Sequence, residues 1–515
     1  MTSTPSATVD HDDLADTDAA AGHWKGLLRR LCGPVWLWPM LATLAITLYH
    51  NSVPVMWQDE LATISVITRP TGQILATLKH VDAVHGLYYL SMHAWTNVVG
   101  YSPFALRFPS AVGMTAAAAF TALVGRRLFG YRAGVAAGLV FAVLPTVARY
   151  GQEARSYALI VMSAALALLL LYRALERPGA LRWTAYGACL VLGGYFNLVS
   201  LAFLCGHALA VLLEYRKTRA RALLIGFPAA VAAAVVVLIP LIKLGTAQST
   251  RQIGWIPKPT VGNLDTIWPQ IFGSVLLTFV LLAFALLAWR QPRRQAVLVT
   301  ATMVLLPWLV IWTISHGHTS YYLSKYLFFV LPPAAVLAGA GLASLRLRYA
   351  MPLMVGLLVV VAPTQRAMHA TMSHGNYVYP DPPVFTPLDY RSAADVVAAG
   401  YRPGDAMVYG QGYHIYFESS VGVPYYLPKD VQPPTLFIDK TAQERNDLWF
   451  TFCADPAACL GDHPRIWLVD LGDVSMANPF QTVIPGQAAV LKEHYTAVQR
   501  TRVNGMTVFL LERTG

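Results

Sequence analysis

Eleven long apolar runs follow one another through this chain, separated by short polar turns. A helix that crosses a membrane needs about 20 apolar residues, and most of the runs approach that length. Only 13% of the 515 residues are charged, whereas soluble proteins carry about 25%, so soluble globular and disordered classes are excluded. The chain is therefore predicted to be a polytopic α-helical membrane protein with spans at 34–53, 104–125, 133–149, 156–172, 183–196, 198–214, 222–244, 269–289, 295–314, 325–344 and 350–364. The two short runs that meet near Asn197 can also be read as one bent element.

Lys and Arg predict the orientation of these spans, because short loops rich in them stay on the cytoplasmic side. Every second turn is basic, starting with Lys25, Arg29 and Arg30 before the first run. This alternation places the N-terminus inside and the C-terminal segment outside the cell membrane. It also accounts for the net charge of +11 as a topology signal, which removes the argument for a nucleic-acid partner.

The chain divides into four predicted parts. Residues 1–30 read as a disordered cytoplasmic tail, because the first 22 of them are acidic, rich in Ser, Thr and Ala, and without an apolar period. They do not form a signal peptide, which needs a basic start followed at once by its apolar stretch. Residues 31–368 form the membrane domain with a long first outer loop at 54–103, residues 369–384 a linker, and residues 385–515 a small extracytoplasmic α/β domain.

The α/β prediction for the C-terminal part depends on a change of pattern. The segment RSAADVVAAG is typical of a helix, and DAMVYG, RIWLVD and TVFLLE are typical of short buried strands. Cys453 and Cys459 lie in this outside part, where thiols in an oxidising compartment tend to pair. A disulfide is expected, with a shared metal as the alternative.

Carboxylates near the outer ends of the spans are the first candidates for chemistry. Asp59 and Glu60 follow the first run, and Glu153 follows the third. Ionisable groups at such places are functional candidates, although two acids after a span can also be a solvated helix end. We expect the acids to converge on one site.

Cations and aromatic residues at the same side form the second group of candidates. Three cations, Arg107, Arg155 and Lys325, lie on the predicted outer side, where the positive-inside rule does not favour them. A bound phosphate would explain positive charge there. Aromatic residues there can simply belong to an interfacial belt. The candidate set is completed by His85, Tyr88, Tyr89 and Tyr326.

Taken in order, these motifs resemble a known family. Asp-Glu after the first span, His-x-x-Tyr-Tyr before LRFPSA, the RRLFG turn, QEARSYAL and a late KYL are together similar to the polytopic GT-C glycosyltransferases. Within them, the chain resembles the bacterial branch of dolichyl-phosphate-mannose protein mannosyltransferase-like proteins, which includes the aminoarabinose transferases of lipid A. The resemblance covers about residues 30–365. It departs from the family at Gly86-Leu87, where Pro-Pro is common, and at Lys325, where Arg is common.

The resemblance implies an enzyme that moves a sugar from a polyprenyl-phosphate carrier to an acceptor outside the membrane. Asp59 matches the catalytic acid and Glu60 its companion, while Glu153 with Arg155 and Lys325 with Tyr326 match the later motifs. An ionised Asp59 can take the proton of an acceptor hydroxyl. Arg155, Lys325 and either Arg69 or Arg107 would neutralise the departing lipid phosphate, and Glu153 would hold Arg155 in place or orient the acceptor. Parts of the superfamily use a divalent metal, but no ligand spacing here requires a metal or other cofactor.

Two other classes compete with the enzyme hypothesis. A transporter or flippase for lipid-linked sugars would predict internal repeats and charged or broken helices near the midplane, and a non-catalytic envelope scaffold would leave Asp59, Glu153 and Arg155 without a role. The resemblance favours mannose as the sugar, while arabinose-type sugars stay open. The acceptor, an envelope glycan, a glycolipid or a protein, also stays open. The C-terminal domain is expected to bind acceptor, through aromatic residues such as Tyr413, Tyr416, Tyr425 and Tyr426, or to cap the site.

Overall fold

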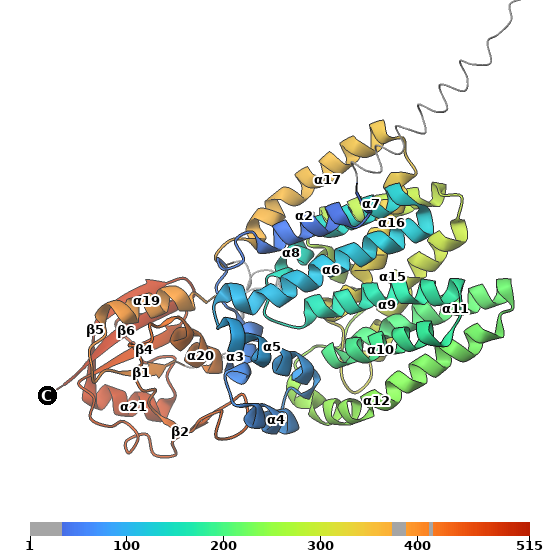
Figure 1. Cartoon of the computed structure of the whole chain (residues 1–515). Coiled ribbons are helices and arrows are strands. Elements are labelled where there is room, and N and C mark those ends of the chain that lie inside the picture. The colour runs from blue at the N-terminus through green and yellow to red at the C-terminus, as the bar shows by residue number, and fades with distance from the viewer. Residues whose placement is uncertain (1–32, 373–387, 411–415, 515) are drawn as a thin grey trace, which may run out of the picture.

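The computed structural model describes residues 33–372, 388–410 and 416–514. It consists of a helical bundle and a smaller C-terminal α/β domain packed against one end of it (Figure 1). We call this end of the bundle the domain end. The predicted tail at 1–30, most of the predicted linker and Tyr413 lie outside the described residues.

Each of the eleven predicted runs coincides with a helix or a pair of helices. Among the described residues, seven helices are long and apolar enough to cross a membrane, and two bent pairs raise this number to nine. The remaining two runs correspond to shorter helices of 12 and 17 residues. The predicted eleven spans thus become seven to nine by length and composition. The bundle comprises α2 (Leu37–Leu48), α6 (Pro103–Phe129), α7 (Tyr131–Val143), α8 (Pro145–Gly151), α9 (Tyr157–Glu176), α10 (Ala180–Phe196), η2 (Leu198–Phe203), α11 (Leu204–Thr218), α12 (Arg221–Ile253), α13 (Asn263–Phe272), α14 (Val275–Leu287), η3 (Ala288–Arg290), α15 (Arg294–Ile314), η4 (Ser324–Val330), α16 (Leu331–Ala343) and α17 (Leu347–Met368).

Small residues allow the central helices to approach closely. A Cβ atom on Gly339 of α16 would lie 2.3 Å from the backbone nitrogen of Ala137 in α7, and one on Gly134 would lie 2.6 Å from the carbonyl oxygen of Ala122 in α6. Membrane helices pack in this way because lipid supplies no hydrophobic drive for their association. The break between α10 and η2 falls at Asn197, whose backbone is extended and whose side chain accepts a hydrogen bond from Val199 N. The two runs that meet there are therefore separate helices.

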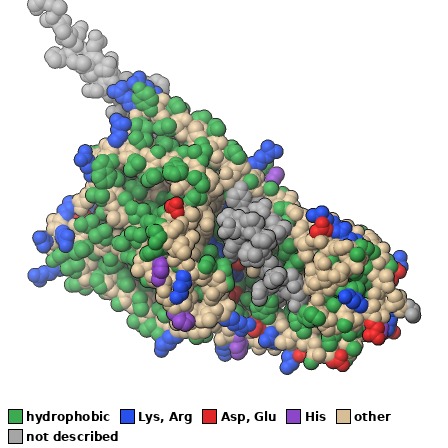
Figure 2. Space-filling view, turned by 180° about the vertical axis from the view of Figure 1, so that it is seen from behind, with side chains coloured by type: hydrophobic (Ala, Val, Ile, Leu, Met, Phe, Trp, Pro, Cys, Tyr) green, Lys and Arg blue, Asp and Glu red, His purple; other side chains and the backbone are tan. Residues whose placement is uncertain are grey.

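Four short elements fill the predicted first outer loop and cover the domain end (Figure 1). They are α3 (Gln58–Ile67), α4 (Thr71–His80), η1 (Ala83–His85) and α5 (Gly86–Val99). The opposite end of the bundle carries the basic turns. There Arg132 donates to Leu345 O and Arg293 to Leu128 O, so the turns meet. Figure 2 shows hydrophobic side chains over the bundle, with Lys and Arg side chains gathered at the end away from the C-terminal domain.

The C-terminal domain contains the predicted helix and the three predicted strands. Its elements are α19 (Tyr390–Gly400), β1 (Ala406–Tyr409), α20 (Tyr416–Tyr426), β2 (Ile438–Lys440), β3 (Thr451–Phe452), β4 (Arg465–Leu471), α21 (Pro485–His494), β5 (Tyr495–Val503) and β6 (Met506–Arg513). The main sheet has the order β1-β4-β6-β5, with β1 parallel to β4 and the other pairs antiparallel. Strand β1 and the centre of β4 read as apolar runs because both of their faces are buried.

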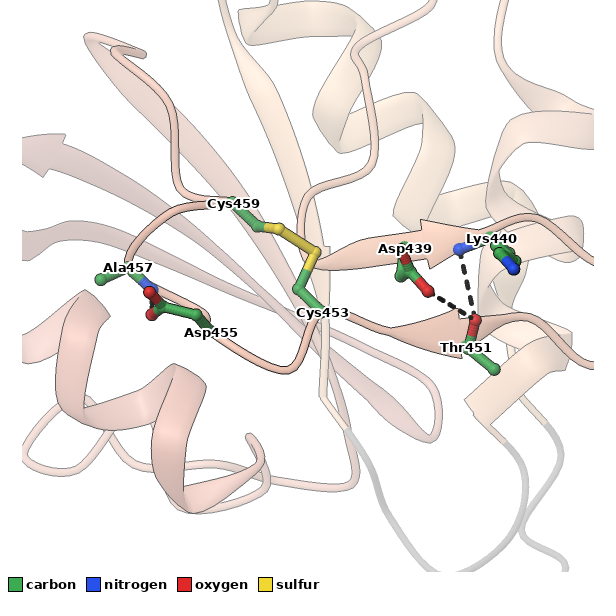
Figure 3. The surroundings of a disulfide bond; sticks show 7 residues. All are labelled: Asp439, Lys440, Thr451, Cys453, Asp455, Ala457 and Cys459. Atoms are coloured by element: carbon green, nitrogen blue, oxygen red, sulfur yellow. Dashed lines mark hydrogen bonds between the residues drawn. A yellow bond between two sulfur atoms is a disulfide. The ribbon is translucent and has the colours of Figure 1, made fainter.

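The C-terminal domain is stabilised by a disulfide within it and by hydrogen bonds to the bundle. Cys453 and Cys459 form a disulfide beside the β2–β3 hairpin (Figure 3). At the interface, Met56 N donates to Tyr426 Oη at 2.9 Å and Tyr425 Oη donates to Tyr101 O at 2.8 Å. These two tyrosines, expected to face an acceptor, therefore serve as contacts between the domain and the bundle. The side chain of Tyr416 lies outside the described side chains.

Candidate active site

The candidate site forms where α3 meets the turn between α8 and α9. Trp57 has an extended backbone that starts α3, and Asp59 and Glu60 occupy the first helical turn. Acidic side chains are favoured there, because the amino end of a helix carries partial positive charge. This local preference places Asp59 at the bundle surface of the domain end, where three other elements reach its carboxylate.

Asp59 is the centre of a cationic and aromatic cluster. Its Oδ2 lies 2.6 Å from Lys325 Nζ, accepts a hydrogen bond from Tyr157 Oη at 3.2 Å, and lies 4.0 Å from Arg155 Nε. The side chain of Asp59 keeps 18% of its surface exposed, against 5% for Lys325. The structure therefore brings together residues that are separated by up to 266 positions in the sequence.

The cations around Asp59 determine its charge. Burial disfavours the carboxylate, but the charges of Lys325 and Arg155 outweigh burial and hold the pKa of Asp59 well below its usual range. The Lys325 ammonium also lies over the rings of Trp57 and Tyr157, at 5.4 and 5.2 Å from their centroids. Asp59 is thus ionised at neutral pH and able to accept a proton.

Arg155 is held from two sides. Its Nη1 donates to Tyr89 Oη at 2.9 Å and its Nη2 lies 3.0 Å from His85 Nε2. Its Nε has no hydrogen-bond partner among the described residues and faces Asp59 from 4.0 Å. One N–H donor of the guanidinium is therefore left at the site.

His85 has a defined tautomer, because arginine only donates hydrogen bonds. His85 Nε2 must accept from Arg155, so the ring proton resides on Nδ1. Burial, and then the charge of Arg155, lower the pKa of His85 well below its ordinary value, so the ring is neutral. The Nδ1 atom is buried and has no partner among the described residues.

A cavity of about 440 Å³ opens beside His85. Its lining is mostly apolar but includes polar side chains such as His85, Gln252 and Tyr326. The wall comes from η2, α12 and α15, with lining residues such as Leu198, Val199, Leu201, Ile242, Val310 and Ile311. The cavity thus joins an apolar channel between helices to the cluster around Arg155.

Glu60 and Arg107 lie apart from this cavity, in a closed ion pair. Arg107 Nε and Nη2 donate to the two oxygens of Glu60 at 2.7 and 2.8 Å, and both side chains are fully buried. Arg107 also donates to the carbonyls of Asn51 and Pro54, and Ala154 N donates to Glu60 at 2.9 Å. The pair therefore ties α3 to α6 and to the turn that carries Arg155, rather than facing a substrate.

Glu153 pairs with Arg149 and not with Arg155, contrary to the expectation that it holds Arg155. The two side chains meet at 2.6 Å across one helical turn, and neither is more than 1% exposed. Burial raises the pKa of Glu153 even though Arg149 opposes the shift. Arg149 lies under the Trp57 ring at 5.2 Å, so the Glu153 pair contacts the site through Trp57.

The remaining predicted residues have mainly supporting positions. Arg69 donates to Ser65 O, Thr77 Oγ1 and Asp447 O at 2.8, 2.9 and 2.7 Å, so it joins α3, α4 and the C-terminal domain. Tyr88 is 1% exposed, whereas Tyr89 reaches Arg155. The described residues contain no group of three or more His, Cys, Asp or Glu side chains that fits a metal ion.

Sequence reasoning missed Asp82, Gln248 and Gln252. Asp82 accepts hydrogen bonds from Tyr89 Oη at 2.6 Å and from Gln252 Nε2 at 2.8 Å. The signal available for Asp82 was its presence as a further acid in the outer loop, three residues before His85. The two glutamines carried no such signal, because they come at the end of an apolar helix.

A family model described as dolichyl-phosphate-mannose-protein mannosyltransferase matches residues 87–243. This stretch runs from α5 into α12 and contains Arg155, but neither Asp59 nor Lys325. No curated protein sequence matches the chain.

Solved structures match over nearly the whole chain. ArnT from Cupriavidus metallidurans bound to undecaprenyl phosphate has a TM-score of 0.57 at 14% identity, covering 92% of this chain and 98% of that one. Its apo state gives 0.57 at 13% identity, covering 95% and 98%. The oligosaccharyltransferase of Archaeoglobus fulgidus, in complex with zinc and sulfate, is less similar, with a TM-score of 0.48 at 12% identity over 92% of this chain and 73% of that one.

These matches confirm the resemblance expected from the ordered motifs. They agree with the apolar helices that a multi-pass membrane protein requires and with the small α/β domain at one end. The chain therefore has the fold of ArnT, and part of it is similar to the protein mannosyltransferase family.

Proposed function

We propose that this protein transfers a sugar from a polyprenyl-phosphate carrier to an acceptor hydroxyl on the outer side of the cytoplasmic membrane. One observation carries the proposal: a largely apolar cavity is lined by His85, His85 contacts Arg155, and Arg155 in turn faces the ionised Asp59. A prenyl chain fits the apolar part of this lining, and its phosphate would lie beside His85, next to Arg155. ArnT, whose fold this chain shares, has been solved with undecaprenyl phosphate bound, which supports this class of donor.

In the proposed reaction, the acceptor oxygen attacks the anomeric carbon of the sugar. The bond from that carbon to the phosphate oxygen breaks, and the electron pair leaves with the lipid phosphate. Asp59 takes the proton of the acceptor hydroxyl, a step worth about 10²–10⁴ in rate. Products are the glycosylated acceptor and the free polyprenyl phosphate.

Three donors are available for the departing phosphate. Lys325 and Arg155 carry positive charge, and the Nε of Arg155 is not used by other described residues. Neutral His85 adds an N–H from Nδ1. Fixed donors aimed at developing negative charge are usually a large term in catalysis. Glu60 and Arg107 act in this proposal only by holding α3 and the Arg155 turn together.

The position of the charges favours an enzyme over a transporter. In the described bundle, the buried Asp, Glu, Lys and Arg side chains all belong to the domain end: Glu60, Arg69, Asp82, Arg107, Arg149, Glu153, Arg155 and Lys325. A transporter would place its substrate site near the bilayer midplane. By the positive-inside rule, the basic turns at the opposite end support an orientation with the domain end outside the membrane, where an envelope acceptor would be available.

Mannose is the sugar proposed, because the matching family model describes mannosyltransferases. The test uses the purified full-length protein in detergent with undecaprenyl phosphates that carry labelled mannose, aminoarabinose or glucose, and with envelope extract as acceptor. Transfer from the mannose donor, together with release of undecaprenyl phosphate, supports the proposal. Transfer only from another donor overturns the choice of mannose, and no transfer from any of the three overturns the proposed function.

A further inference from the structure

Asp82 is linked to Arg155 through Tyr89, and its carboxylate accepts hydrogen bonds from two side chains. It precedes η1, is 8% exposed, and has a left-handed backbone with φ of 57°. One carboxylate oxygen accepts from Tyr89 Oη at 2.6 Å and the other from Gln252 Nε2 at 2.8 Å. Asp82 does not itself line the cavity, and the reaction as proposed gives it no role.

The hydroxyl of Tyr89 connects Asp82 to Arg155, so Asp82 can fix the orientation of the Arg155 side chain. A tyrosine has one hydroxyl proton, and the Tyr89 proton is given to Asp82. The lone pairs of the same oxygen are then available to Arg155 Nη1, which lies 2.9 Å away. Because His85 Nε2 accepts from Nη2, both terminal nitrogens of Arg155 are fixed and its Nε is aimed at Asp59.

Helix α12 supports the turn that carries Asp82. Gln248 accepts from Ala83 N at 2.9 Å and donates to Leu78 O at 3.0 Å. Gln252 follows four residues later, on the same face of the helix, and donates to Asp82. Gln252 and His85 also line the cavity. The hydrogen bond from Gln252 to Asp82 therefore connects the cavity lining to the turn at 82–85.

We propose that Asp82 is a positioning residue for sugar transfer, which acts through Tyr89 to set the guanidinium of Arg155 at the donor phosphate. This inference rests on the proposed function. A misplacement of about 1 Å at a reacting group costs on the order of 10²-fold in rate. Asp82 should therefore affect turnover more than donor binding.

The test is a double-mutant cycle on the full-length protein. Asp82→Asn keeps the shape and tolerates the left-handed backbone, in which Asn and Asp are enriched. Tyr89→Phe removes the transmitting hydroxyl. We expect each variant to lower kcat for the undecaprenyl-phosphate sugar by about 10- to 100-fold, with little change in KM. The double variant should be no slower than Tyr89→Phe alone, because both changes break one chain of contacts.

The outcomes separate the two proposals. If Asp82→Asn has the activity of the unaltered protein, or if its loss multiplies with that of Tyr89→Phe, the positioning role is wrong. If the unaltered protein transfers no sugar, the proposed function itself fails. Should Asp82→Asn not fold, Gln252→Leu takes its place, and its loss of kcat must likewise disappear in the Tyr89→Phe background. The exposed Asp265→Asn is the control and should transfer at the normal rate.

Discussion

Lys325 Nζ lies 2.6 Å from Asp59 Oδ2 and joins the start of η4 to the first turn of α3. The lysine comes 266 residues after the aspartate. Tyr157 contacts both side chains, donating to Asp59 and offering its ring to Lys325. The pair keeps Asp59 ionised in a buried setting, and a substrate phosphate would compete with Asp59 for the same ammonium.

Replacing Lys325 should change both the rate and its pH dependence. In Lys325→Gln the burial of Asp59 persists while its nearest cation is lost, so the pKa of Asp59 should rise toward or above its usual range. A larger fraction of Asp59 is then protonated and unable to accept a proton. We expect about 10²-fold lower kcat/KM at neutral pH, with partial recovery as pH rises. Lys325→Arg should be much more active.

The check is transfer measured between pH 5.5 and 8 for the original protein and the two variants. The original protein keeps its carboxylate charged across this range, because the pKa of Asp59 is lowered. A Lys325→Gln variant with normal activity, or one whose activity falls as pH rises, would contradict this role for the pair.

Glu60 is predicted to contribute mainly to stability. Glu60→Gln leaves the guanidinium of Arg107 buried without its counter-charge, which typically costs about 3–5 kcal/mol. We expect a large fall in the thermal unfolding midpoint of the detergent-solubilised protein, measured by a fluorescence melt. Glu493→Gln, an exposed change on α21, should melt normally. Equal midpoints for the two variants would show that the Glu60–Arg107 pair does not carry the structure of the site.

Asp447 should control how firmly the C-terminal domain holds the bundle. It accepts two hydrogen bonds from Arg251 of α12, at 2.8 and 2.7 Å, and its backbone carbonyl accepts one from Arg69. Arg251 is half exposed, so Asp447→Asn should cost no more than about 1 kcal/mol. Limited proteolysis should cut this variant faster near residues 440–450. Asp430→Asn, an exposed change in the same domain, should be cut at the normal rate, and equal rates would exclude this role of Asp447.

Hydropathy and charge patterns predicted the bundle and the C-terminal domain because burial in lipid, or on both faces of a sheet, leaves a local periodic signal. Span length was less predictable, since α2 has only 12 residues although its apolar run at 34–53 suggested a full span. The partners of individual ion pairs could not be predicted from the local sequence. Glu153 is close in sequence to both Arg149 and Arg155, and the turn between α8 and α9 decides that Arg149 is its partner. Glu60 and Arg107 come from elements 47 residues apart, and no periodicity indicates that they meet.

The role of Asp59 as the base is tested most directly by Asp59→Asn, assayed for transfer of labelled sugar from undecaprenyl phosphate at saturating donor and acceptor. Asparagine keeps the shape but cannot take the acceptor proton, so we predict a loss of kcat of about 10²-fold or more. The unfolding midpoint should remain measurable, and Asp265→Asn should be fully active. Full transfer by a folded Asp59→Asn variant would contradict the account.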